Sequence, residues 1–499
     1  MELSMEALER SELSRSLDEN VETFKRLLRG DVNSDVQFRR LSHGGVDLCV
    51  MYMEGMADDR KISDFILRPC ERSASEYSGI PDTRYFIGRV IEIPQCETER
   101  RVGEILDQVV TGMTALLIDG CDEAVLTETR GYPARPVNKT TNESVVIGAQ
   151  EGFVESLRTN MTLMRRYLPS PRLITECLTV GTRVPCHVAL VYLEGVAEAD
   201  VVSRMRRRLK AIAAPSVQGV GAIQQHIEDS PWALLPQMLQ TEHPDRAASC
   251  LLEGQVAVLA DNSPCALIAP VTLFHLLHAS DDSFSRWQYG TFIRLIRVAG
   301  MLVSTLLPGL YIALTDYHMH LLPLSLLASI AEARANVPFP ILAEILIMEF
   351  SFYLINEAGT RMPQQIGPAL GIVGALILGQ AAVAASIIGP ILIIIVAITG
   401  LGNYAIPDYG FGVGLVLCRL FVILCGALYG LYGVCVAVFC LLVGLCGMRS
   451  LGCPYLAPVA PPTPHNPDLL TRMPVWTQFR ARPFSTMGHR ACGRERRPI

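Results

Sequence analysis

One segment near the C-terminal end constrains this chain more than any other. From Gly410 to Gly447 the sequence is almost entirely apolar and carries a single charged residue, Arg419. About 20 apolar residues suffice for a helix to cross the hydrocarbon core of a bilayer, so this run is long enough for two crossings. The residues before about position 290 have instead the mixed polarity of a water-soluble module. The pattern therefore predicts a soluble part joined to a small membrane domain.

Other apolar stretches extend the predicted membrane domain back to about Phe292. They are Leu295–Thr315, Leu321–Ala331, a glutamate-containing stretch from Pro338, and Ile366–Gly402, with a break expected at Gly389 and Pro390. The C-terminal tail is rich in proline and arginine, and the positive-inside rule places such a tail in the cytoplasm. The charged N-terminus lacks the apolar core of a secretory signal, so the soluble part is expected there too. Both ends inside require an even number of crossings, and we expect four, with six as the alternative.

An internal repeat organises the soluble part. The sequence VMYMEGMA from Val50 resembles LVYLEGVA from Leu190, 140 positions later, and each is an apolar run closed by glutamate and glycine. A second pair, GMTALLIDG from Gly112 and GQVAVLADN from Gly254, has nearly the same offset. Buried strands that end in turns have this pattern. Two matched pairs at one spacing predict two copies of one α/β unit.

The segment between the two copies has helical periodicity. Apolar residues recur on one face at Phe153, Leu157, Met161, Met164 and Leu168. Glutamates lie near its start and arginines near its end, which is the polarity that suits a helix dipole. These features predict an amphipathic helix that docks on the two units or links them.

The expected fold is multi-domain, with a cytosolic α/β module of two similar subdomains followed by a polytopic α-helical membrane domain. In chain order we expect a charged N-terminal helix or tail (1–25), a first α/β subdomain (26–142), the linking helix with a second α/β subdomain (143–285), a helical membrane domain (286–450) and a cytoplasmic tail rich in proline and arginine (451–499).

Catalytic and cofactor signatures are absent from the sequence. It has no P-loop, HExxH helix, GxSxG elbow or set of kinase motifs. The net charge of −6 gives no basic footprint for nucleic acid. The 15 cysteines lack CxxC spacing and indicate reduced thiols. Asp316, His318 and His320 could suggest a metal site, but a hydrated loop after an apolar stretch explains them more simply. We therefore expect no enzyme activity, no cofactor and no metal.

Polar residues within the apolar half are the candidate functional residues. A charge at bilayer depth costs roughly a few kcal/mol on insertion scales, so such a side chain is expected to face protein, water or an opposite charge. Glu344 and Glu349 differ by about 140° around a helix and are not expected to line one narrow face. One could face a conduit while the other pairs, with Arg419 as a partner. The candidates for an ion path or a buried polar network are Glu344, Glu349, Glu357, Arg361, Gln380 and Arg419.

Two interpretations of these candidates stay open at this point. They could line an ion path, or they could form interior salt bridges that orient the helices. Glu357 and Arg361 are spaced for a local ion pair on one helix, although Gly359 between them weakens that helix.

Five dissimilar blocks of sequence resemble one known family, in the family's order. They are ESVVIGAQEGFVESLRTNMTLMRR from Glu143, TEHPDRAASCLLEGQVAVL from Thr241, VPFPILAEILIMEFSFYLINEAGTRMPQQIG from Val337, GIVGALILGQAAV from Gly371 and RSLGCPYLAP from Arg449. Over about residues 25–480 the chain resembles the A-type subunit of the GerA family of spore germinant receptors. The family's motif residues are here Glu151, Gly152, Phe153, Pro454 and Tyr455.

The resemblance implies a membrane subunit of a multi-protein complex in the inner membrane of the bacterial endospore. Its partners would be a transporter-like B-type subunit, which binds the nutrient germinant, and a C-type lipoprotein. The A-type subunit would oligomerise as a homo-oligomer, surrounded by membrane lipid, into a nutrient-gated cation channel. Its soluble half would then face the spore core.

The chain departs from the family pattern at two places. The family usually has a run similar to RGPREGF, whereas here the residues at 147–150 are IGAQ, so two basic residues and a proline are missing. His243 stands where the family usually has arginine. Two rival functions also stay open. One is an accessory scaffold of germination, similar to the SpoVAF branch of the family, and the other is a secondary transporter with a cytosolic regulatory domain.

Overall fold

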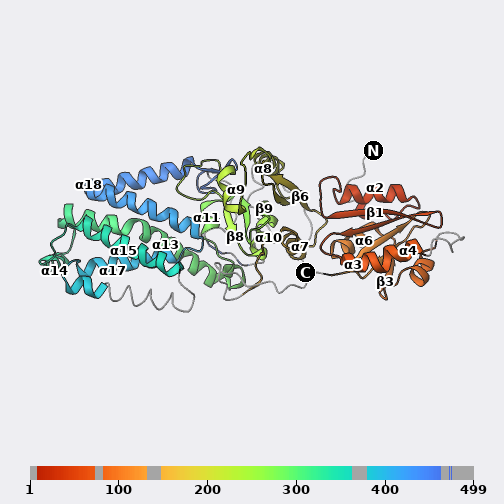
Figure 1. The fold of residues 1–499 in the computed structure, drawn as a ribbon. Coiled ribbons are helices and arrows are strands. Elements are labelled where there is room, and N and C mark those ends of the chain that lie inside the picture. The colour runs from red at the N-terminus through yellow and green to blue at the C-terminus, as the bar shows by residue number, and fades with distance from the viewer. Residues whose placement is uncertain are drawn as a thin grey trace.

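The structure is a computed structural model that describes residues 8–72, 82–131, 148–361, 379–461, 471–472 and 474. The molecule is elongated, with two sheet-containing subdomains and a helical bundle arranged in a row (Figure 1). The first subdomain lies at one end, the bundle lies at the other, and the second subdomain contacts both. The order of the parts in space is therefore their order along the chain.

The first subdomain is a five-stranded antiparallel sheet covered by helices on both faces. Its strands are β1 (Val36–His43), β2 (Val46–Met53), β3 (Cys96–Glu99), β4 (Thr114–Ile118) and β5 (Ala124–Thr127), in spatial order β1-β2-β4-β5-β3. Its helical segments are α2 (Leu17–Leu27), α3 (Asp59–Ile62), η1 (Ser63–Leu67), α4 (Arg68–Arg72), α5 (Thr83–Tyr85), η3 (Phe86–Val90) and α6 (Val102–Val110). Phe24 of α2 and Ile105 of α6 are buried on one face of the sheet, and Ile66 and Phe86 are buried on the other.

The second subdomain repeats this architecture with the same strand order. Its strands are β6 (Leu173–Val180), β7 (Cys186–Leu193), β8 (Leu239–Thr241), β9 (Val256–Ala260) and β10 (Ala266–Ala269), ordered β6-β7-β9-β10-β8 and antiparallel throughout. Its helices are α7 (Leu157–Tyr167), α8 (Ala199–Ala211), α9 (Gly219–Ile227), α10 (Pro244–Leu252) and α11 (Leu273–Leu276). The two sequence pairs at the common offset fall on β2 and β7 and on β4 and β9, as two copies of one unit require.

Matching residues in the two subdomains also make matching contacts. In α2, the Asn20 side chain accepts a hydrogen bond from the Ser14 amide at 2.9 Å and donates one to the Ser14 carbonyl. In α7, 140 positions later, Asn160 accepts from the Val154 amide at 2.8 Å and donates to the Val154 carbonyl. A buried asparagine side chain that hydrogen-bonds to the backbone of the segment before the helix is therefore part of the repeated unit.

The boundary expected at residue 25 differs from the structure. The N-terminal helix α2 is not a separate tail, because Leu17, Val21 and Phe24 are buried in the core of the first sheet. The outer face of α2 is charged, so a reading based on charge alone does not reveal the apolar stripe on its inner face.

The helix expected to link the subdomains is α7, the counterpart of α2 in the second unit. It begins at Leu157, later than the periodicity suggested, because the Ser156 side chain caps it by accepting a hydrogen bond from the Thr159 amide. Glu151 therefore precedes the helix and cannot act on its N-terminal dipole. It instead forms an ion pair with Arg166 in the last turn.

The C-terminal part of the described chain is helical. Its elements are α12 (Asp281–Phe284), α13 (Trp287–Ile312), η4 (Ala313–Tyr317), η5 (Met319–Leu321), α14 (Leu324–Arg334), α15 (Ile341–Arg361), α17 (Pro390–Tyr404) and α18 (Tyr409–Gly447). The break expected at Gly389 and Pro390 is the start of α17. Within the described residues, two segments, Trp287–Tyr317 and Tyr409–Gly447, are long and apolar enough to cross a membrane, and α17 is a shorter apolar helix.

The long helix α18 consists of two limbs joined at Gly430. That residue has φ 59° and ψ −142°, a conformation open to glycine but strained for other residues. Leu415 before the break and Leu445 after it both pack against the apolar core of the second subdomain. The chain therefore runs away from the second subdomain, turns at Gly430 and comes back, and the two limbs of α18 are visible in Figure 1.

The residues after α18 return to the second subdomain. Strands β11 (Arg449–Ser450) and β12 (Cys453–Pro454) form a small hairpin, and Leu451 and Tyr455 are completely buried there. The boundary expected at 450 therefore differs from the structure, because the first residues of the expected tail are part of the subdomain's core.

Candidate functional site

A buried ion pair joins three helices in the middle of the bundle. The carboxylate of Glu349 in α15 accepts from the guanidinium of Arg419 in α18, with 2.9 Å between Oε2 and Nη2. The same Nη2 donates to the Tyr353 hydroxyl at 2.6 Å, and Nη1 lies 3.4 Å from the Ser304 hydroxyl of α13. The sequence left the partner of Arg419 open, and the structure places Glu349 there.

This ion pair is almost completely excluded from solvent. Both side chains are buried, and within the described residues Oε1 of Glu349 and Nε of Arg419 lack a hydrogen-bond partner. Removing one member of such a pair leaves an uncompensated charge and typically destabilises a protein by about 3–5 kcal/mol. The pair therefore locks α15 to α18, and any movement that separates the two helices must supply another partner for each charge.

A second buried carboxylate, Glu344, lies near the start of α15. Oε1 of Glu344 in α15 is 3.2 Å from Nη2 of Arg334, and Oε2 accepts from the backbone amide of Gly389 at 3.0 Å. Gly389 is the N-cap of α17, so the carboxylate also lies at the positive end of that helix dipole. Arg334 approaches Asp316 as well, at 3.8 Å. Glu344 and Glu349 thus have separate cationic partners, in agreement with their separation around the helix.

The other candidates do not join this network. Glu357 and Gln380 are exposed. The side chain of Arg361 lies outside the described residues, so its expected ion pair with Glu357 stays a prediction. Among the described residues no group of three potential metal ligands gathers, and the imidazole of His318 contacts the Ala313 carbonyl at 3.2 Å. Among the described candidates, Glu344, Glu349 and Arg419 are therefore the ones whose side chains are buried in the bundle.

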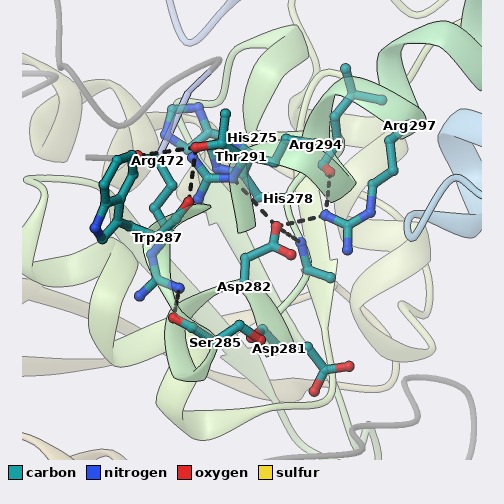
Figure 2. A network of polar contacts seen from close by, with 12 residues as sticks. His275, His278, Asp281, Asp282, Ser285, Trp287, Thr291, Arg294, Arg297 and Arg472 are labelled. Atoms are coloured by element: carbon teal, nitrogen blue, oxygen red, sulfur yellow. Dashed lines mark hydrogen bonds and ion pairs between the residues drawn. The ribbon is translucent and has the colours of Figure 1, made fainter. Parts of the chain in front are cut away.

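A third polar network lies where the chain enters the first long helix. Asp282 is buried and accepts from Arg297 at 2.6 Å, with Arg294 at 3.5 Å (Figure 2). Arg472, from beyond the bundle, donates to the Ser285 carbonyl at 2.6 Å and accepts from the Thr291 hydroxyl. Arg294 and Arg297 flank the start of the apolar stretch expected from Leu295, and the sequence gave no sign of Asp282 or Arg472 as partners.

Two of the family motif residues lie where the second subdomain packs against the bundle. Phe153 and Tyr455 are buried in one apolar cluster with Ile406, Phe411 and Leu415 of the helical part. The Tyr455 hydroxyl donates to the Pro236 carbonyl at 2.9 Å, and burial raises the pKa of this phenol well above 10.0. Phe153 and Tyr455 of the motif therefore belong to the junction between the second subdomain and the bundle.

Contacts of a different kind join the two subdomains. Arg165 of α7 reaches across to Asp35, with 2.6 Å between Nη2 and Oδ2, and both side chains are buried. The Asn33 side chain accepts from the Thr175 amide at 3.2 Å, and Arg29 pairs with Glu194 at 2.7 Å. Sequence reasoning assigned Arg165 to the helix dipole, and no local pattern could have revealed a partner 130 positions away.

Comparison with known proteins identifies relatives over nearly the whole chain. The family described as Bacillus/Clostridium GerA spore germination protein matches residues 22–484. Spore germination protein KA of Bacillus subtilis (strain 168) is 33% identical over 468 residues, covering 93% of this chain and 86% of that protein. Spore germination protein B1 of the same organism is 33% identical over 471 residues, covering 93% of this chain and 96% of that protein.

Among solved structures, similarity is found to the crystal structure of the N-terminal domain of the A subunit of the Bacillus megaterium spore germinant receptor GerK3. It covers 52% of this chain and 96% of that domain, with 25% sequence identity and a TM-score of 0.40.

Proposed function

Because this chain belongs to the GerA family of spore germination proteins, we propose that it is the A-type membrane subunit of a spore germinant receptor. In this proposal the subunit oligomerises into a cation channel in the inner membrane of the endospore. A transporter-like B-type subunit supplies the response to a nutrient, and a C-type lipoprotein completes the complex. Channel opening starts the release of ions with which germination begins.

The observation that carries the proposal is the buried pair of Glu349 and Arg419 in a bundle of apolar helices. Charges of this kind are rare in membrane segments, and they usually mark ion paths, proton relays or switches. Each member of the pair retains one buried polar atom without a hydrogen-bond partner among the described residues. A rearrangement of α18 against α15 would free the Glu349 carboxylate to face a conduit, where its charge would attract cations.

The course of the chain supports a membrane domain with both flanks on one side. The bundle begins at Trp287, next to the second subdomain, and after Gly447 the chain packs onto that subdomain again. An even number of membrane crossings places both flanks of the domain on the same side. We infer that the soluble module and residues 449–461 share the cytoplasmic side, which in a spore is the core.

The small size of the bundle supports an oligomeric ring. A few helices from one subunit make a thin wall for a water-filled pore, whereas several copies around an axis can enclose one. Large apolar side chains such as Phe350 and Phe439 are exposed on the outside of the bundle and are available to lipid or to neighbouring subunits.

The second candidate function is an accessory scaffold that modulates germination without conducting ions. The observation that favours it is that both buried glutamates, Glu344 and Glu349, already have arginine partners. In that case the charges only orient the helices.

Cation efflux from liposomes tests the proposal. The purified chain would be reconstituted alone and with B-type and C-type subunits, and potassium release would be recorded before and after addition of mixed amino acids and sugars. Glu349→Gln should change the rate or the preference for cations over anions, because it removes the charge proposed to face the conduit. Glu332→Gln, at an exposed position of α14, is the matched control and should behave as wild type.

Particle size measured in parallel separates the outcomes. An oligomer whose flux responds to Glu349→Gln supports the channel. A chain that binds its partners but gives no flux under any of these conditions supports the scaffold and contradicts the channel.

A further inference from the structure

One loop of the second subdomain exposes apolar side chains to an unusual degree. It connects α9 to β8, and its tip is Pro231, Trp232, Ala233 and Leu234. Trp232 is 96% exposed and Leu234 is 50% exposed. The sequence from Ser230 to Thr241 contains no charged residue. A fully exposed tryptophan on a water-soluble surface is unusual, because this side chain buries a large apolar area when it finds a partner.

The exposure belongs to an ordered loop. The buried side-chain amide of Gln237 accepts from the backbone amides of Asp229 and Ser230, both at 3.0 Å, and donates to the Ser230 carbonyl at 2.7 Å. The Asp229 carboxylate accepts from the Gly452 amide at 2.8 Å, and the Tyr455 hydroxyl donates to the loop at Pro236. Both ends of the loop are therefore fixed, so its tip projects in a set direction.

The loop lies beside the beginning of α18. A Cβ added at Gly414 would lie 2.5 Å from the Leu234 carbonyl oxygen and 2.7 Å from a Leu235 methyl group, so the glycine permits the contact. A Cβ at Gly410 would lie 3.8 Å from the Pro236 ring. Since a helix rises about 1.5 Å per residue, Gly414 is about 7–8 Å along the helix from Tyr409. Along the axis of α18, the loop tip therefore lies beside the first turns of a candidate membrane span.

We propose that residues 231–234 insert into the interfacial layer of the bilayer, with Trp232 as the anchor. The indole ring suits that layer because it combines a large apolar surface with one hydrogen-bond donor. The absence of charge from Ser230 to Thr241 removes the groups that would oppose insertion next to acidic lipid headgroups. Tyr409, 77% exposed at the start of α18, lies at the same level. The anchor holds the second subdomain against the membrane surface.

This inference rests on the proposed membrane position of α18, because the loop is level with a span only if α18 crosses the bilayer. A protein partner is the competing occupant. The test must therefore report on the loop and on the spans separately.

Tryptophan fluorescence of the full chain in liposomes provides this test. The other two tryptophans, Trp287 and Trp476, are replaced by phenylalanine, so that all emission comes from Trp232. The liposomes contain either ordinary phospholipid or phospholipid brominated on its acyl chains, and acrylamide serves as the aqueous quencher. We expect blue-shifted emission that loses intensity to the brominated lipid. Emission quenched by acrylamide alone, or shielded from both quenchers by a protein partner, overturns the proposal.

Two span reporters separate this failure from failure of the proposed function. Phe350→Trp in α15 and Phe439→Trp in α18 each replace an exposed aromatic residue, in a chain that also carries Trp232→Phe. If brominated lipid quenches a span reporter but leaves Trp232 unaffected, the loop inference fails while the membrane domain stands. If no span reporter is quenched, the membrane placement itself fails, and the loop inference fails with it.

A single substitution tests the same point if the multiple variants do not fold. In the otherwise native chain, Trp232→Phe should remove a lipid-quenched component of the emission. An unchanged lipid-quenched fraction would contradict insertion of the loop.

Discussion

The two junctions of this chain are made of different chemistry. Between the first and second subdomains the contacts are charged and polar, with Asp35 bonded to Arg165 at their centre. Between the second subdomain and the bundle one apolar cluster is continuous from the strands β7 and β9 to Phe411 and Leu415 of α18. The first subdomain has separate apolar clusters of its own.

The difference indicates which parts can move as units. When the first junction opens, water solvates the separated charges of Asp35 and Arg165, and this offsets the loss of their buried ion pair, so the junction can open and close. Separating an apolar core exposes its whole buried area to water, which is unfavourable. We therefore expect the second subdomain and the beginning of α18 to move together, whereas the first subdomain can turn against them.

The largest effect is expected from truncation of the apolar junction. Phe411→Ala removes a completely buried ring shared by α18 and the second subdomain and should destabilise the chain by about 3–5 kcal/mol. Thermal unfolding in detergent, followed by intrinsic fluorescence, measures the change. Tyr409→Ala, two residues away at an exposed site, is the control. Equal unfolding temperatures for the two variants would contradict a core continuous across this junction.

A smaller and more local effect is expected at the polar junction. Asp35→Ala leaves the buried guanidinium of Arg165 without its carboxylate, although Arg165 still donates to the carbonyls of Ser170 and Leu173. We expect a loss of about 3 kcal/mol, at the low end for a broken buried pair, because these two acceptors stay in place. Hydrogen exchange should rise around Asn33 and Thr175 while the strands of both sheets stay protected.

Asp35→Asn is the matched variant, since it keeps the shape and a hydrogen-bonding oxygen. If Asp35→Ala instead unfolds the second sheet, the two junctions are not separate and the comparison fails.

The β11–β12 hairpin, which packs on the second subdomain, should also weaken in alkaline solution. Burial raises the pKa of the Cys453 thiol from 9.0 to about 11. Below pH 9.0 the thiol is protonated in both states and its stabilising contribution is complete. As the pH rises from 9.0 to about 11, ionisation favours the unfolded chain, and about 2–3 kcal/mol is lost. Unfolding temperatures of wild type and Cys453→Ala across this range should converge, and parallel curves would contradict the assignment.

The smallest effect is expected from an exposed ion pair at the polar junction. Arg158 of α7 pairs with Glu54 of the first subdomain, and the arginine side chain is largely exposed. Arg158→Ala should change stability by about 0–1 kcal/mol, because solvent and salt screen such pairs. A change as large as that of Asp35→Ala would show that the exposed rim, rather than the buried pair, holds the subdomains together.

The repeat, the break before α17 and the helical bundle could be predicted from the sequence, since each leaves a local signal. The common offset placed two strand pairs, and Gly389 with Pro390 predicted a break, which is where α17 begins. The apolar stripe of Leu17, Val21 and Phe24 was also visible in principle, but the surrounding charges led to a helix or tail separate from the first subdomain being expected there.

Contacts between distant positions were predicted only in part. The sequence indicated Arg419 as a partner for Glu344 or Glu349 but not for which of them, and it gave no sign of the pair of Asp35 and Arg165, which are 130 positions apart. Tyr455 stands in a short segment with no periodicity, so nothing local indicated that it is buried. The same holds for Asp282, which is one of several acidic residues before α13 until the fold brings two arginines to it.

Hydrogen exchange of the membrane-embedded chain, compared between wild type and Phe411→Ala, tests the central claim most directly. The claim is that the second subdomain and α18 form one cooperative unit to which the first subdomain is joined by polar contacts. The account predicts that protection falls together in β9, β10 and the first limb of α18, while β2 and β4 keep theirs. A loss confined to α18, or one that spreads equally into the first subdomain, would contradict it.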